Sequence, residues 1–252
     1  MIDLLPVERL GLLLVRPGML VMSLPLFGSV FAPMALRVGL LVLLATMMLP
    51  AVAVPETFGP AGITAVVARE ALIGLALAMG IRTLIAGAEF GGHLASFQIG
   101  FGYASLVDPQ TGVRNNLLSS FYSLLTLVVM FGINAHHDVV RALVLSYDVL
   151  PLGQGGVDGS MASMVARMLG AVFVVGVQLA APVVIVLVVV ELALGLLSRA
   201  APTLNLMAQG FPIRLLVGLL AMAATVRVIP GLVAGLVPAS IDLGARLAVL
   251  FR

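Results

Sequence analysis

The stretch FQIGFGYASLV at residues 97–107 runs directly into the polar stretch DPQTGVRNN at residues 108–116, and this junction decides the fold. Pro109 fixes one corner of a tight turn, the Asp108 side chain can cap that turn, and Gly112 permits a positive φ. Long apolar segments lie on both sides of it. Because lipid cannot satisfy the backbone of such a turn, the turn either reaches water or lines a cavity.

The composition is that of a membrane protein. Of the 252 residues, 62% are hydrophobic and 10% are charged, whereas a soluble domain is about 45–50% apolar and about 25% charged. The chain has no cysteine, which excludes a disulfide framework, a thiol nucleophile and a cysteine metal site. Its net charge is +2, and without a basic patch we expect no nucleic-acid partner.

Leucine and alanine dominate and strand alternation is absent, so the sequence predicts an all-α, membrane-type subunit with kinked, broken hydrophobic helices and helical hairpins. The expected helices lie near residues 3–15, 18–32, 34–49, 62–95, 116–134, 137–149, 160–200 and 213–250. We expect loops at about 50–62 and 151–160, a turn region at about 97–116, and a single domain over 1–252.

Charged side chains recur inside the apolar segments at roughly even intervals. They include Arg69, Glu70, Arg82, Glu89, Arg141, Arg167, Glu191, Arg199, Arg214, Arg227 and Arg246. Each charge at the centre of a lipid-exposed helix costs about 2.5–3.5 kcal/mol. We therefore expect many hydrophobic faces to pack against protein through small residues, as in a subunit of a larger assembly. An ordinary polytopic protein with kinked spans is the alternative.

Few residues are candidates for catalysis or for binding a metal. The only histidine cluster is His136-His137-Asp138, and adjacent histidines on a helix point about 100° apart, whereas metal-binding pairs are three or four positions apart. We therefore expect no metal, no cofactor and no catalytic set, and assign His136 to capping or packing. Glu191 lies in an apolar run and is either a proton or ion relay or the partner of an arginine. We favour the arginine, which would be one such as Arg199 or one on a partner chain.

Three positions predict breaks between helices. Asn134 precedes the histidine pair and indicates a helix break. Pro202 ends the long preceding helix and opens the stretch Pro202-Thr203-Leu204-Asn205. Gly210-Phe211-Pro212 then reopens the chain for the next helix. From these residues alone the protein is a channel, a transporter or an assembly subunit.

Four stretches, in their order along the chain, carry a resemblance to a known family. They are QIGFGYASLVDP (98–109), Asn134-Ala135-His136-His137, Leu150-Pro151-Leu152-Gly153, and Arg199 to Asn205 followed by Gly210-Phe211-Pro212. Together they resemble the FliR family of flagellar biosynthesis proteins, which also includes the T subunit of virulence type III secretion systems. Two departures are His93, where the family usually has an acid, and Ala135, where it usually has glycine.

The resemblance implies a non-enzymatic subunit of the flagellar type III protein export gate. Its expected partners are FliP-like and FliQ-like subunits, an FlhB-like switch protein, unfolded secreted proteins in transit and membrane lipid. The expected location is the bacterial inner membrane at the flagellar basal body.

The resemblance also implies that the region 97–116 acts as a plug in the closed channel. The stopper would be formed by Phe97, Gln98, Gly100, Phe101, Gly102 and Tyr103, and its tip shaped by Asp108, Pro109 and Gly112. Residues expected to break or pack helices are Asn134, His136, Pro202, Asn205, Gly210, Phe211 and Pro212.

Three alternatives remain open. The virulence counterpart is the first, because one sequence does not reveal genomic context. The second is a secondary transporter with a site near Gln178 and Glu191, although such folds usually have two matching inverted halves, and no such symmetry is found here. A membrane enzyme comes third, since no convincing acid–base or metal set is present.

Overall fold

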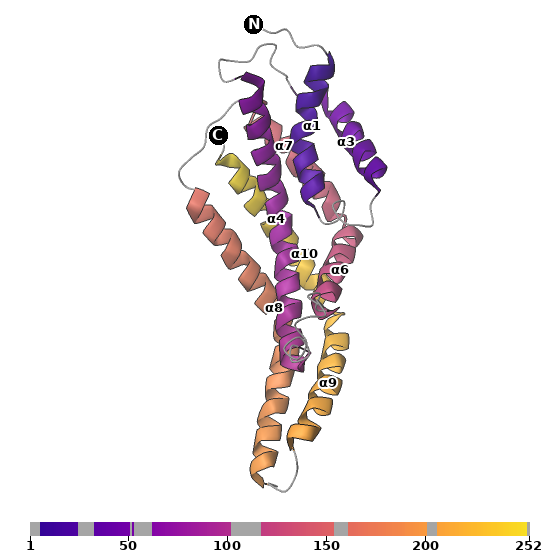
Figure 1. Cartoon of the computed structure of the whole chain (residues 1–252), viewed down its shortest axis with the longest axis vertical. Coiled ribbons are helices and arrows are strands. Elements are labelled where there is room, and N and C mark those ends of the chain that lie inside the picture. The colour runs from indigo at the N-terminus through magenta and orange to yellow at the C-terminus, as the bar shows by residue number, and fades with distance from the viewer. Residues whose placement is uncertain are drawn as a thin grey trace, which may run out of the picture. The chain divides into compact units, whose positions relative to one another are not determined.

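The computed structural model describes residues 6–24, 33–50, 52, 62–101, 117–153, 161–200 and 206–250. These residues form eight helices and no strand, which confirms the all-α prediction (Figure 1). They divide into two compact units. Unit 1 comprises Met1–Thr83, Asn134–Leu169 and Val237–Arg252, and unit 2 comprises Leu84–Ile133 and Gly170–Leu236. The single domain expected over 1–252 stays a prediction.

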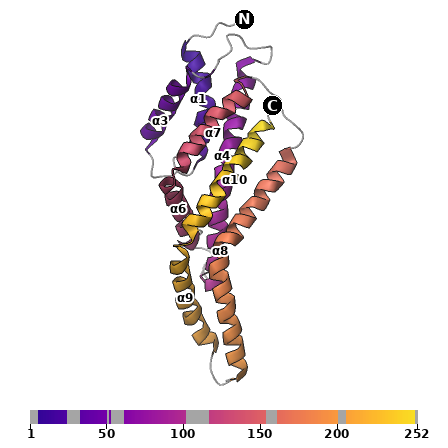
Figure 2. The ribbon, with the colours of Figure 1, turned by 180° about the vertical axis from the view of Figure 1, so that it is seen from behind.

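Unit 1 is built from α1 (Pro6–Ser23), α3 (Met34–Met48), the first part of α4 (Gly62–Ile99), α7 (Ala135–Val149) and the last part of α10 (Ile229–Val249). Figures 1 and 2 show α1 lying beside α3 and beside the first part of α4. Leu13 of α1, Ile73 of α4 and Leu143 of α7 are completely buried. Apolar side chains from three helices therefore form the core of this unit.

Unit 2 is built from the rest of α4, α6 (Leu117–Gly132), most of α8 (Met161–Ala200), α9 (Leu206–Thr225) and the start of α10. Figure 2 shows α8 and α9 running side by side. One core cluster of this unit contains Ala95, Ile99, Leu118, Val183 and Leu187, with Leu215, Ala221 and Met222 packed against it. Side chains from α4, α6, α8 and α9 thus meet around the end of α4.

Several described helices can cross a membrane. Three of them, α4, residues 163–200 of α8, and α10, are long and apolar enough, and α6 with α7 qualifies as one broken span. In the most apolar window of α4, 67% of the residues are buried, against 33% in that of α8. The protein is therefore membrane-type, and α4 is covered mainly by its own chain while α8 leaves apolar side chains uncovered.

The expected packing through small residues is found along α4. In unit 1, Gly80 approaches the backbone of Gly244 on α10. In unit 2, a Cβ placed at Gly91 would lie 2.8 Å from the carbonyl oxygen of Gly176 on α8. Glycines let two helix backbones come this close because they carry no side chain at the contact.

Two expected helix boundaries are wrong. Helices were expected at 3–15 and 18–32, but α1 is continuous from Pro6 to Ser23 with Pro17 inside it. Buried Leu13 and Leu20 lie on either side of Pro17, and this packing outweighs the hydrogen bond that proline removes. Residues 18–32 also extend beyond the described part of the chain.

The helix expected at 213–250 is two helices, α9 and α10, separated at residues 226–228. Pro230 is the second residue of α10, and proline fits the first turn of a helix because the first N–H groups have no partner there. Helix α9 begins at Leu206 rather than near 213. Gly210, Phe211 and Pro212 therefore lie within a helix, and the break expected at these residues is corrected.

Candidate functional site

Helix α4 ends in a turn that requires glycine. Gly100 has a φ of 107°, in the region that other residues rarely adopt. Its N–H donates to the Phe97 carbonyl oxygen at 3.2 Å, and the Phe101 N–H donates to the Ser96 carbonyl oxygen at 3.1 Å. This pair of bonds is the Schellman ending of a helix, which satisfies carbonyl groups that the last turn leaves open.

Two aromatic side chains stand exposed at this end of α4. Phe97 is 66% exposed and Phe101 is 37% exposed, whereas Ile99 between them is completely buried. Gln98 is half-buried. Phe97 and Gln98 lie in the last turn of α4, so the first residues of the expected plug are helical. The other expected plug residues, Gly102, Tyr103, Asp108, Pro109 and Gly112, lie outside the described residues.

Close contacts hold the end of α4 within unit 2. A Cβ placed at Gly92 would lie 2.5 Å from the Cα atom of Ser119 on α6, and one placed at Gly218 of α9 would lie 2.5 Å from Cγ1 of Ile99. Glycine at these two positions lets α6 and α9 approach α4. The exposed aromatic rings therefore project from a helix end that is firmly packed on its other side.

Unit 1 contains a buried ion pair between two residues that are far apart in the sequence. The Arg16 Nε atom donates to Oε2 of Glu70 at 2.7 Å, and both side chains are completely buried. The Arg16 Cζ atom lies 3.9 Å from the centre of the Tyr147 ring, a cation–π arrangement. The available signal was that both charges lie on apolar helices, where a buried charge needs a partner.

The same pair holds the turn that follows α7. Arg16 Nη2 donates to the Leu150 carbonyl oxygen at 3.0 Å, and Arg16 Nη1 donates to Ser146 Oγ at 2.9 Å. The Gly153 N–H donates to Glu70 Oε1 at 3.3 Å, and Arg69 Nη1 donates to the Gly153 carbonyl oxygen at 3.1 Å. The stretch Leu150–Gly153, one of the four that carry the family resemblance, is thereby bound to α1 and α4.

Asn134 lies between α6 and α7 in a left-handed conformation, with φ 59° and ψ 27°. Asparagine tolerates this conformation better than most residues. The His137 N–H donates to the Asn134 carbonyl oxygen at 2.9 Å. His136 is half-buried, and its ring centre lies 4.3 Å from that of His137. Pro202 and Asn205, the other expected breaking residues, lie outside the described residues.

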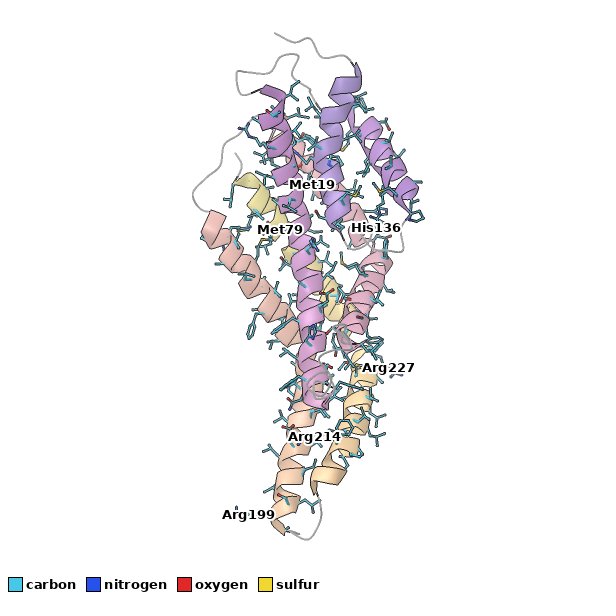
Figure 3. All side chains as sticks on the ribbon, in the orientation of Figure 1. Met19, Met79, His136, Arg199, Arg214 and Arg227 are labelled. Carbon is cyan, nitrogen blue, oxygen red and sulfur yellow. The ribbon has the colours of Figure 1, made fainter. Side chains whose placement is uncertain are left out.

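Glu191 has an arginine partner, although not the one suggested. Its Oε1 atom lies 3.7 Å from Nη1 of Arg214 on α9, and both side chains are about one-third exposed. Figure 3 places Arg199 at the far end of α8, away from Arg214. In the described part of the chain, no group of three His, Cys, Asp or Glu side chains could hold a metal ion.

Comparisons with known proteins cover most of the chain. The family model described as "Bacterial export proteins, family 1" matches residues 7–239. The flagellar biosynthetic protein FliR of Bacillus subtilis (strain 168) is 31% identical over 232 residues, which are 90% of this chain and 89% of the relative. FliR of Pectobacterium carotovorum is 28% identical over 218 residues, 86% and 83% of the two chains. The surface presentation of antigens protein SpaR of Shigella sonnei is 30% identical over 128 residues, 51% and 49% of the two chains.

Proposed function

The chain belongs to family 1 of the bacterial export proteins and is a membrane subunit of a flagellar type III protein export gate, and we propose that it closes the export path with the end of α4. The observation that carries this proposal is the combination of a glycine-terminated helix end with two exposed aromatic rings. Phe97 and Phe101 are exposed while Ile99 between them is buried. Such rings can seal a narrow apolar opening, because aromatic side chains bury a large area.

Gly100 supports a stopper that moves without unfolding the helix. The turn at Gly100 has a positive φ, and glycine crosses between backbone regions at little steric cost. Ile99, in the core of unit 2, keeps α4 in place on one side of that turn. Residues beyond Gly100 would then swing aside when a substrate arrives, as loops do in other gates.

The proposal includes the partners and the location. FliP-like and FliQ-like subunits would cover the apolar side chains that α8 and α9 leave exposed, such as Leu196 and Leu216. An FlhB-like switch protein would join the same complex, and unfolded proteins would pass through it. The site would be the bacterial inner membrane at the flagellar basal body. No catalytic step is proposed for this chain, and export would be driven from elsewhere in the apparatus.

A virulence-type export apparatus is the second candidate, because SpaR matches half of the chain. The FliR proteins of Bacillus subtilis and Pectobacterium carotovorum each match more than 80% of both chains, and this longer match favours the flagellar system. Genomic neighbours distinguish the two: genes for hook and rod proteins support the flagellum, and genes for needle or translocon proteins support the virulence system.

The plug is tested by permeability of the assembled gate. The double variant Phe97→Ala with Phe101→Ala and a deletion of residues 106–112 are each expressed with the other gate subunits in cells without flagellar substrates. We expect both to let a small ionic dye or potassium ions cross the membrane faster than the unchanged protein does. The first variant removes the rings, and the second removes the turn that would shape the tip of the stopper.

Phe173→Ala is the matched control, because Phe173 on α8 is 59% exposed and lies away from the turn at Gly100 in sequence. Permeability in this variant should stay at the level of the unchanged protein. The proposal fails if both plug variants accumulate and assemble normally while their permeability equals that of the control. Co-purification with FliP-like and FliQ-like chains tests the partners separately.

A further inference from the structure

Four hydroxyl groups are buried in unit 2 without a hydrogen-bond partner among the described residues. They are the side-chain oxygens of Ser96, Ser119, Tyr122 and Thr126. Ser96, Tyr122 and Thr126 are completely buried, and Ser119 is 6% exposed. We call these four residues the hydroxyl seam. Buried polar groups in folded proteins nearly always have a partner, so each of these oxygens requires an explanation.

Hydroxyl groups elsewhere in the apolar helices of this chain bond to their own helix. Thr83 donates to the Met79 carbonyl oxygen at 2.8 Å, and Thr225 donates to the Met222 carbonyl oxygen at 2.7 Å. This bond to a carbonyl three or four residues earlier is the usual solution for serine and threonine within a helix. Ser96, Ser119 and Thr126 do not make it. These three hydroxyls are therefore open to a partner outside their own helix.

The four residues lie along the contact between α4 and α6. Ser119, Tyr122 and Thr126 are spaced three and four residues apart, which places them on one face of α6. The Gly92 contact brings the backbone of α4 against Ser119, and Ser96 lies one turn further along α4. The side chain of Thr225 on α9 lies near the Tyr122 hydroxyl.

We propose that the hydroxyl seam binds ordered water molecules between α4 and α6. Ser119, Tyr122 and Thr126 lie one helical turn apart, where Cβ atoms are about 5–6 Å from each other, yet their hydroxyls do not bond one another. A single water spans such a gap, and buried waters typically make about three hydrogen bonds to groups that would otherwise have none. Hydroxyls both donate and accept, which suits water at every position of the seam.

Bound water in this seam would connect the two helices that enter and leave the region 97–116. Helix α4 precedes that region and α6 follows it. Water-mediated bonds are close in enthalpy to direct bonds and exchange partners easily. The seam would hold the α4–α6 contact together while letting the helices shift. This inference does not depend on the plug, because the seam lies within unit 2 whether or not the channel is closed by it.

The test uses the full chain purified with its gate subunits and three single variants, Thr126→Val, Ser119→Ala and Ser96→Ala. Each removes a hydroxyl and leaves the bulk of the side chain. If water binds the seam, each loss deprives the water of a partner, and we expect the unfolding equilibrium to shift about fivefold toward the unfolded state. Thr83→Val is the control, because Thr83 bonds to its own helix, and we expect a smaller shift.

A change in stability of the opposite sign overturns the proposal. If the hydroxyls bind nothing, removing them abolishes a cost of burial, so equal or greater stability in all three variants excludes bound water. A density map of the assembled gate gives the second readout. Ordered density between Ser119 and Thr126 supports the proposal. Its absence from a map that shows other interior waters contradicts the proposal, even where a variant fails to fold.

Discussion

Arg16 and Glu70 are 54 positions apart in the sequence, yet the Arg16 Nε and Glu70 Oε2 atoms lie 2.7 Å apart with both side chains completely buried. The pair connects α1 to α4, and through Leu150 and Gly153 it also holds the turn after α7. Taking two charges out of water is costly, so a buried pair adds little net stability by itself. Its consequence is that neither charge can be lost alone.

Replacing Glu70 with leucine should destabilise the protein by about 3–5 kcal/mol, because the Arg16 guanidinium would stay buried without its counter-charge. Denaturant unfolding in detergent and the amount of protein in the membrane measure this loss. The double variant Glu70→Leu with Arg16→Met should recover part of it, since two apolar side chains need no partner.

The control for this prediction is Asp242→Ala. It removes the Arg246–Asp242 pair, whose side chains are 72% and 58% exposed, and exposed pairs contribute about 0.2–1 kcal/mol. If Glu70→Leu cost no more than Asp242→Ala, the buried pair would not hold unit 1 together.

The helical class could be predicted from the sequence because it depends on local composition. Long runs rich in leucine and alanine without strand alternation form helices wherever they pack. The boundary between α9 and α10 left a local mark in the sequence, since Pro230 favours the first turn of a helix. Prolines also lie inside α1, α9 and α10, so proline alone did not locate this boundary.

The remaining features depend on contacts between distant residues. Helix α1 continues through Pro17 because residues such as Leu13 and Leu20 are packed, and tertiary packing of this kind overrides local preference. The partner of Arg16 could not be predicted, because α1 and α4 meet only in the folded chain. For Glu191 an arginine partner was expected, but the choice of Arg214 required α9 to lie beside α8.

Gly100→Ala should weaken the end of α4 by about 1–2 kcal/mol, because alanine at a φ of 107° is strained. Export should fall as well, since the chain would leave α4 in another direction. Swimming through soft agar and secretion of hook protein measure export, and unfolding in detergent measures stability.

Gly170→Ala is the matched control for this variant. A Cβ placed at Gly170 of α8 meets nothing within 4 Å, so alanine there should stabilise the helix by about 0.5–1 kcal/mol. Equal effects of the two substitutions would show that the turn at Gly100 has no special requirement for glycine.

Gly92→Val should separate α4 from α6. A Cβ at Gly92 would lie 2.5 Å from the Cα atom and 2.8 Å from the backbone nitrogen of Ser119. These backbone atoms cannot move aside as the end of a flexible side chain can. We expect a loss of about 1–3 kcal/mol, the usual cost of overpacking, measured by thermal unfolding in detergent. Gly218→Ala should cost less, because its closest contact is the Ile99 side chain. A larger loss at Gly218 would contradict this order.

Glu191→Gln should leave export and protein amount nearly unchanged. The carboxylate lies 3.7 Å from Arg214 Nη1, and both side chains are about one-third exposed, so the pair contributes at most about 1 kcal/mol. A proton relay would instead require a group that gains and loses a proton, and an ion relay would require the negative charge of the carboxylate; glutamine provides neither. Swimming speed and secretion of hook protein distinguish the two roles, with Arg214→Gln as the companion variant that breaks the same pair and keeps the carboxylate. Loss of export in Glu191→Gln together with normal export in Arg214→Gln would assign Glu191 to transport rather than to packing between α8 and α9.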